Sequence, residues 1–148
     1  YDAGALLLTV FDTNCGEVPP SVYEEFCVED LKYIATEVKK QRPHALLTVF
    51  PKDGEISVFN DSDYDVVGVS WRASPKEARR QCPDKTLQGN LDPYVLYANP
   101  AVVHKTAERM AKEFGSQKYI ANLGHGMMPT HPTETPQAFM DAIDAAGP

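Results

Sequence analysis

Residues 119–126 read YIANLGHG, an apolar run that is broken by Gly124, His125 and Gly126. Such a run predicts a β-strand, and the flanking glycines leave room for a ligand to approach the imidazole. In parallel α/β proteins the functional side chains lie at the carboxyl ends of the strands. His125 is therefore a candidate for proton transfer or anion binding, and the alternative is an ordinary loop histidine.

Strand and helix patterns alternate along the rest of the chain. Pro75 and Pro100 each follow a residue that can cap a helix, Ser74 and Asn99. No hairpin dipeptide joins neighbouring strands, so the pattern predicts a parallel α/β sheet. Short βα units favour a (β/α) barrel of TIM type, incomplete because a closed one needs eight strands. The predicted strands are 6–11, 45–50, 65–71, 86–91 and 118–123, and the predicted helices are 19–40, 75–81, 100–114 and 133–145.

The composition narrows the range of functions. The 148 residues suit one domain, 1–148, and the net charge of −7 without a Lys/Arg-rich run argues against a nucleic-acid partner. Three dispersed cysteines, Cys15, Cys27 and Cys82, lack zinc spacing and are predicted to be free thiols. No signal peptide is visible and no apolar run is long enough to span a membrane, so we expect a protein that is not secreted.

Five segments together resemble one family. They are VFDTNCG at 10–16, FPKDG at 50–54, YDVVG at 64–68 with Trp71 behind it, LQGNLDP at 87–93 followed by Tyr97, and YIANLGHG at 119–126. In this order and spacing they resemble the C-terminal part of uroporphyrinogen decarboxylase. The resemblance covers nearly the whole chain, and the combination of LQGNLDP with NLGHG is highly specific.

The resemblance implies a fold and a reaction. The family fold is a (β/α)8 barrel, commonly a homodimer, of which this chain would supply the fourth to eighth strands. The family removes the carboxyl groups of the four acetate side chains of uroporphyrinogen III, which gives coproporphyrinogen III in haem and chlorophyll biosynthesis. It uses no cofactor and no metal, and it works in the cytoplasm or, in plants and algae, in the plastid.

The resemblance also implies roles for particular residues. His125 matches the cleft histidine that contacts substrate carboxylates or pyrroles. Thr13 matches a position usually held by serine, and Phe11 matches an aromatic residue that lines the cleft. Ser70 stands where the family's GLDW motif has an aspartate. The family's essential aspartate and its arginine clamp lie N-terminal to the matched part, so no catalytic residue is assigned here.

The charge balance limits what the chain is expected to do alone. Uroporphyrinogen carries eight carboxylates, and binding it requires several cations in the cleft. Only Arg72 directly follows a predicted strand. Arg79 and Arg80 lie on a helix expected to cover the outside of the barrel, and Arg42 follows a helix, away from the expected cleft. We therefore expect this chain alone not to be competent for the reaction.

Other candidate residues have simpler interpretations. Asn90 and Asp92 could contact a ligand, but turn chemistry before Pro93 is favoured. Cys15 is interpreted as a free thiol because no base is near in sequence. His125 and His131 lack a third ligand for a metal. The aspartates of the loops that follow the second strand, Asp53, Asp61 and Asp63, are interpreted as exposed-loop carboxylates.

Three functions remain open from the sequence. The chain is part of a working decarboxylase, a non-catalytic structural subunit derived from one, or a tetrapyrrole-binding module. Five parallel strands leave two open sheet edges, which proteins normally cover. We expect the N-terminal half, a second copy or another protein to cover them.

Overall fold

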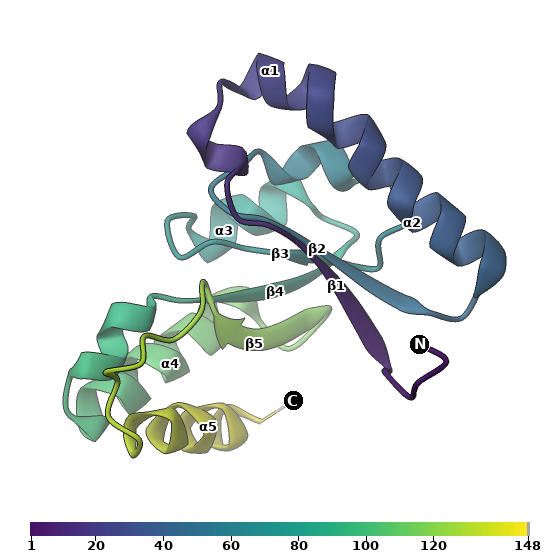
Figure 1. Ribbon diagram of the computed structural model, residues 1–148. Helices are drawn as coiled ribbons and strands as arrows, with labels where there is room; N and C mark the ends of the chain where they lie inside the picture. The colour runs from purple at the N-terminus through teal and green to yellow at the C-terminus, as the bar shows by residue number, and fades with distance from the viewer. Residues whose placement is uncertain (148) are drawn as a thin grey trace.

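The computed structural model describes residues 1–147 and holds one sheet of five parallel strands, in the order β1-β2-β3-β4-β5 (Figure 1). Each strand pairs with the next one along the chain, as where Leu7 lies opposite Leu46. The sheet is open, because β1 and β5 each pair on one side only. The fold predicted from the sequence, an incomplete parallel (β/α) barrel, is confirmed. The strands are β1 (Leu7–Asp12), β2 (Leu46–Pro51), β3 (Val66–Gly68), β4 (Thr86–Leu91) and β5 (Tyr119–Leu123).

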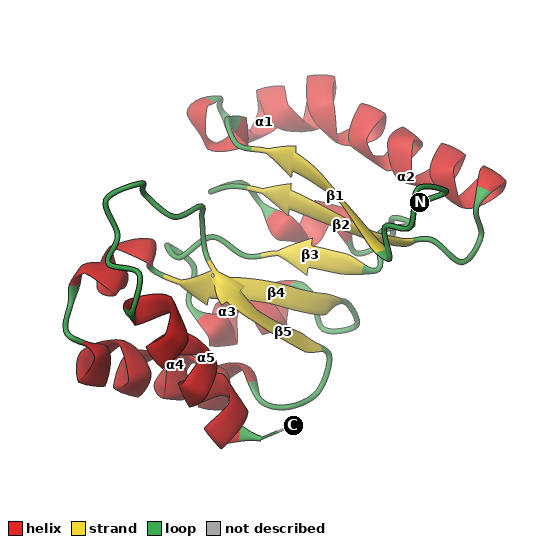
Figure 2. Ribbon diagram, turned by 60° about the horizontal axis from the view of Figure 1, so that its bottom comes forward, coloured by secondary structure: helices red, strands yellow, loops and turns green. Residues whose placement is uncertain are grey.

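Helices follow the strands and gather on one face of the sheet. In Figure 2 α2 runs along the β1 side of the sheet, α3 lies behind the strands, and α4 and α5 lie along the β4–β5 side. None of the helices within residues 1–147 combines the length and the apolar character needed to cross a membrane. The helices are α1 (Pro20–Tyr23), α2 (Glu29–Gln41), α3 (Pro75–Gln81), α4 (Pro100–Phe114) and α5 (Thr135–Ala146).

The ends of two helices follow the expected capping chemistry. The Ser74 hydroxyl accepts a hydrogen bond from the Glu77 amide at the start of α3. The Asn99 side chain accepts one from the Val102 amide at the start of α4. Gly115, with φ of 76°, ends α4 in a backbone conformation that favours glycine.

The core lies between the sheet and its helices. Alternate residues of each strand point to opposite faces, so one set meets the helices and the other lies on the opposite, bare face. Leu47 and Val49 of β2 and Val67 of β3 are almost completely buried in the core. On the bare face stand Thr9 and Phe11 of β1, and there the sheet forms a cavity.

Two predicted elements differ from the structure. Strand β3 ends at Gly68, three residues before the expected end at Trp71, because residues 70–73 form a turn in which the Ala73 amide donates to the Ser70 carbonyl. The helix expected over 19–40 is interrupted by a π-helical turn at Glu24–Val28 that separates α1 from α2. Short 3₁₀ turns at Cys15–Glu17, Ile56–Phe59 and Pro93–Tyr97 were not anticipated.

Candidate functional site

A cavity of about 390 Å³ lies on the bare face of the sheet. Its walls come from both edge strands, because Phe11 belongs to β1 and Asn122 to β5. Side chains at opposite edges of a five-stranded sheet can share one cavity only when the sheet is strongly curved, as in a barrel. The remaining lining residues are Thr9, Thr13, Thr48, Phe50, Gly68, Gln88, Leu123, His125 and Gly126.

The three site residues suggested by the sequence all line this cavity. Thr13 directly follows β1, and His125 follows β5 by two residues. The Phe11 side chain is 71% exposed and meets Phe50 edge to face, with ring centroids 6.2 Å apart. The cavity therefore combines an aromatic wall with a hydroxyl and an imidazole at its rim.

The imidazole of His125 rests on the indole of Trp71. The two rings are stacked, with centroids 5.7 Å apart and planes at 15°. Gly124 makes this approach possible, because a Cβ at that position would lie 2.3 Å from the Trp71 amide nitrogen. The first glycine of the GHG motif is thus explained by a close backbone contact that no local pattern reveals.

Two polar side chains of the cavity were missed by the sequence analysis. The Thr48 Oγ1 and the Gln88 Oε1 are buried and have no hydrogen-bond partner within residues 1–147. Buried polar atoms are normally paired, and unpaired ones call for an explanation such as a bound ligand. The only sequence signals were a threonine inside the apolar run LLTVFP and a glutamine inside LQGNL.

A charged cluster lies beside the cavity at the ends of β2 and β3. The Asp53 carboxylate accepts a hydrogen bond from the Ser70 hydroxyl. Its Oδ2 lies 3.3 Å from the Lys52 Nζ and 3.7 Å from the Arg72 Nε. Burial raises the pKa of Asp53, but the hydrogen bonds from Ser70 and Lys52 and the charge of Arg72 outweigh it, so the pKa lies below the usual value.

The interpretation of Asp53 as an exposed-loop carboxylate is wrong. Its side chain is only 15% exposed, because Ser70 and two cations enclose it. Asp61 and Asp63, by contrast, are exposed as expected. The structure also shows what Ser70 does, since this hydroxyl holds the carboxylate of Asp53.

Asn90 and Asp92 have architectural contacts. The buried Asn90 amide donates to the carbonyl oxygens of Ser70 and Ala73, at 2.9 and 2.7 Å. These two bonds enclose the turn that carries Trp71. The Asp92 Oδ1 accepts from the Tyr94 amide at 2.9 Å, which is the turn chemistry favoured from the sequence.

No cysteine or arginine that the structure describes lines the cavity. All three cysteines are free, and burial raises the pKa of Cys15 to about 11. The Arg79 guanidinium donates to the carbonyl oxygens of Lys85 and Lys118, so it joins loops outside the sheet. Within residues 1–147, no three His, Cys, Asp or Glu side chains form a cluster that could hold a metal ion.

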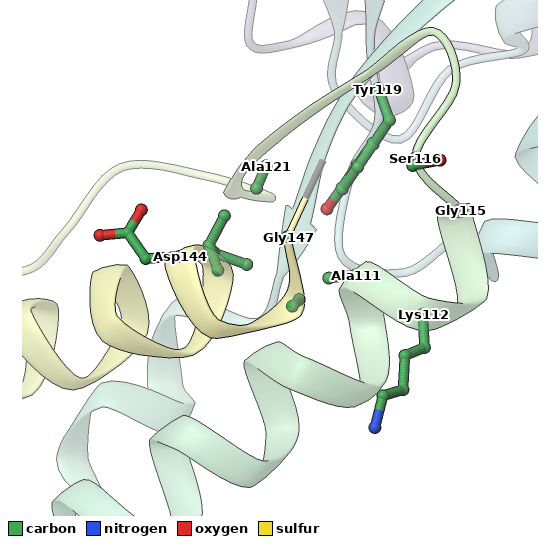
Figure 3. A pocket seen from close by; sticks show the side chains of 10 residues that line it. Ala111, Lys112, Gly115, Ser116, Tyr119, Ala121, Asp144 and Gly147 are labelled. Atoms are coloured by element: carbon green, nitrogen blue, oxygen red, sulfur yellow. The ribbon is translucent and has the colours of Figure 1, made fainter.

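A second cavity, of about 420 Å³, lies on the helix side of β5 (Figure 3). Tyr119 and Ala121 border it from the strand, and the ends of α4 and α5 close it. The Tyr119 hydroxyl donates to the Gly89 carbonyl, and the nearby Lys112 pairs with Glu108. The Tyr119 and Lys112 side chains are therefore engaged within the chain, and the described lining of the cavity holds no histidine or arginine.

Comparisons with known proteins point to one family. The family model described as "Uroporphyrinogen decarboxylase (URO-D)" matches residues 1–146. Proteins named uroporphyrinogen decarboxylase from Dictyostelium discoideum, Salinibacter ruber and Homo sapiens are 40%, 41% and 37% identical over 95%, 96% and 95% of this chain. The chain spans about two fifths of their length, 40%, 41% and 41% respectively.

A solved structure shares the fold. A methyltransferase from Methanosarcina mazei superimposes with a TM-score of 0.81 over 97% of this chain and 43% of its own. The sequence identity is 18%, so the likeness extends to the fold and no further.

Proposed function

Because the chain belongs to the uroporphyrinogen decarboxylase family, we propose that it forms the C-terminal part of a decarboxylase barrel that acts on uroporphyrinogen III. In this proposal β1 to β5 are the fourth to eighth strands of the barrel, and residues 1–148 are one portion of a single domain. The observation that carries the proposal is the cavity in which Phe11 and Thr13 from β1 meet His125 from beyond β5.

The proposed reaction removes carbon dioxide from the acetate side chains of the substrate. The bond between the carboxyl carbon and the methylene breaks, and the electron pair passes into the protonated pyrrole, which acts as the electron sink. A proton added at the methylene carbon then gives a methyl group, and the ring releases the proton that it had taken up. The protein's task is to bind and orient the substrate and to exclude water.

The residues of the cavity fit this task. The imidazole of His125 can donate a hydrogen bond to a carboxylate or a pyrrole, and its stack on Trp71 fixes the plane of the ring. Phe11 and Phe50 offer an apolar wall for a macrocycle. Thr13 and Thr48 add hydroxyl groups, and Thr48 has no partner among residues 1–147 that would compete with a ligand.

The open edges of β1 and β5 require a partner. Unpaired strand edges are aggregation sites unless another element covers them. We expect an N-terminal barrel half, which would also supply the family's aspartate and arginine clamp. A second copy of the chain or a different protein at the same edges is the alternative.

The proposal is tested by the native mass of the isolated chain, with its partners identified, followed by an assay of uroporphyrinogen III conversion. We expect conversion when an N-terminal barrel half is present and none from the chain alone. His125→Asn should then lower the rate, whereas His44→Asn, at an exposed position after α2, should not. Equal rates for both variants contradict the role of His125.

The same experiment separates the other two functions. Association with unrelated proteins and no conversion would favour a structural subunit derived from a decarboxylase. Tetrapyrrole binding without conversion, even in the assembled barrel, would favour a binding module. A cytoplasmic or plastid location stays a prediction from the family.

A further inference from the structure

Charged and aromatic side chains from three strand ends gather around Trp71. His125 stacks on the indole from the end of β5. The Lys52 Nζ, beyond the end of β2, lies 5.7 Å from the centre of the indole. The Cζ of Arg72, beyond β3, lies 5.8 Å from the same ring. Both distances fall in the range of cation–π attraction.

The cluster carries an excess of positive charge. Lys52 and Arg72 bring two cations, and Asp53 is the one carboxylate of the described chain paired with them. The Lys52 side chain is 16% exposed, so its charge is held close to the protein, whereas that of Arg72 is 70% exposed. The Arg72 Nε lies 3.7 Å from the Asp53 Oδ2, which is beyond hydrogen-bonding distance. Among residues 1–147 the two terminal nitrogens of Arg72 have no hydrogen-bond partner, so they can donate hydrogen bonds to a carboxylate.

The backbone beneath the cluster is held in place. Asn90 ties both ends of the turn that carries Trp71 and Arg72. The Gly124 backbone also packs directly against the backbone of Trp71. Aromatic and cationic groups are therefore presented at fixed positions, which lowers the entropic cost of binding a ligand there.

We propose that Lys52, Arg72 and His125, arranged around Trp71, form an anion-binding site at the rim of the cavity that takes a carboxylate group of the tetrapyrrole. The identity of the ligand rests on the proposed function. The site gives a chain of net charge −7 a local positive surface, which reaches the cavity through His125. It also assigns Arg72 and Lys52 to substrate binding, whereas the family resemblance pointed only to His125, Thr13 and Phe11.

The experiment uses Trp71, the only tryptophan of the chain, as a reporter located at the site itself. The purified chain is titrated with uroporphyrin, the stable oxidised octacarboxylate, and with the tetracarboxylate coproporphyrin. Binding is measured by calorimetry, and Trp71 emission is corrected for porphyrin absorption against free tryptophan amide. We expect uroporphyrin to bind with quenching of Trp71, and coproporphyrin to bind more weakly.

The variants test the two cations. Arg72→Gln and Lys52→Gln should each weaken uroporphyrin binding about three- to fivefold, as expected for partly exposed ion pairs. Arg72→Lys should keep part of the affinity because it keeps the charge without the planar fork. Arg80→Gln removes the same charge from α3, where Arg80 pairs with Glu77, and should leave affinity unchanged. Circular dichroism checks that each variant is folded.

Two results would overturn the assignment. One is uroporphyrin binding by the unmodified chain that Arg72→Gln and Lys52→Gln weaken no more than Arg80→Gln. The other is the absence of binding by the unmodified chain. Failure of the proposed function has a different signature, because binding at Trp71 then persists while the barrel assembled with an N-terminal half converts no uroporphyrinogen.

Discussion

Replacing Gly124 by alanine tests whether the close contact between the GHG motif and Trp71 holds the site together. The new Cβ would lie 2.3 Å from the Trp71 amide nitrogen and 2.8 Å from the Cα and Cβ of the same residue. Because two of these atoms belong to the backbone, no change of side-chain rotamer relieves the overlap. The turn cannot easily withdraw either, since Asn90 binds it at Ser70 and Ala73.

The expected cost follows from this overlap. Inserting one carbon into a well-packed region costs about 1–3 kcal/mol of unfolding free energy. Gly126→Ala is the matched control in the same motif, because a Cβ there meets nothing within 4 Å and the backbone is not in the left-handed region. That control should be neutral or more stable by up to about 1 kcal/mol, since alanine restricts the unfolded chain.

Urea unfolding of the three proteins measures the difference. Far-UV circular dichroism gives the free energy of unfolding, and Trp71 emission reports the local environment. We expect Gly124→Ala to unfold at lower urea and to shift the emission, because the indole separates from His125. The reasoning is refuted if Gly124→Ala and Gly126→Ala have the same midpoint and the same native spectrum.

Three further predictions concern the interior and the charged cluster. Thr48→Val should leave the free energy of unfolding unchanged or raise it by up to about 1 kcal/mol in thermal unfolding, because it removes a buried hydroxyl without a partner. A clear loss of stability would show that this hydroxyl makes a hydrogen bond in the folded protein. With a thiol reagent at about pH 8, half-buried Cys27 should react first, because burial raises the pKa values of Cys15 and Cys82 to about 11, and Cys27→Ser should abolish the fast phase. The fold lowers the pKa of Asp53, so the stabilisation by its ionised carboxylate is complete above the ordinary pKa of 3.8 and is lost as the pH falls below it. Asp53→Asn tolerates the φ of 61° at this position. A pH series of urea midpoints should therefore show a smaller loss of stability in acid for this variant than for the unmodified chain.

Local patterns were sufficient for most of the fold. Alternating strands and helices, with capping residues at Ser74 and Asn99, predicted a parallel sheet, and α4 begins and ends where expected. The third strand was predicted too long because Val69 is completely buried although β3 ends before it. Burial in a turn and burial in a strand look alike in a sequence.

The candidate site was less accessible to sequence reasoning. His125 was indicated by its position at a strand end, whereas Phe11 and Thr13 were suggested only by the family resemblance. The environment of Asp53 could not be predicted, because Ser70 and Arg72 lie 17 and 19 positions further along the chain. Thr48 and Gln88 were missed for a similar reason, since only the three-dimensional structure reveals that a buried polar atom has no partner.

The order of the strands has a consequence for how the chain reaches its fold. Each strand from β2 to β5 pairs with the strand before it in the sequence. During synthesis, the strand edge with which each of them pairs has therefore already left the ribosome. Folding can therefore proceed from the N-terminus by adding one unit at a time, with a short loop closure at each step. Every intermediate then exposes an unpaired strand edge, and the longest such interval is the synthesis of α1 and α2, when the edge of β1 has not yet been covered by β2.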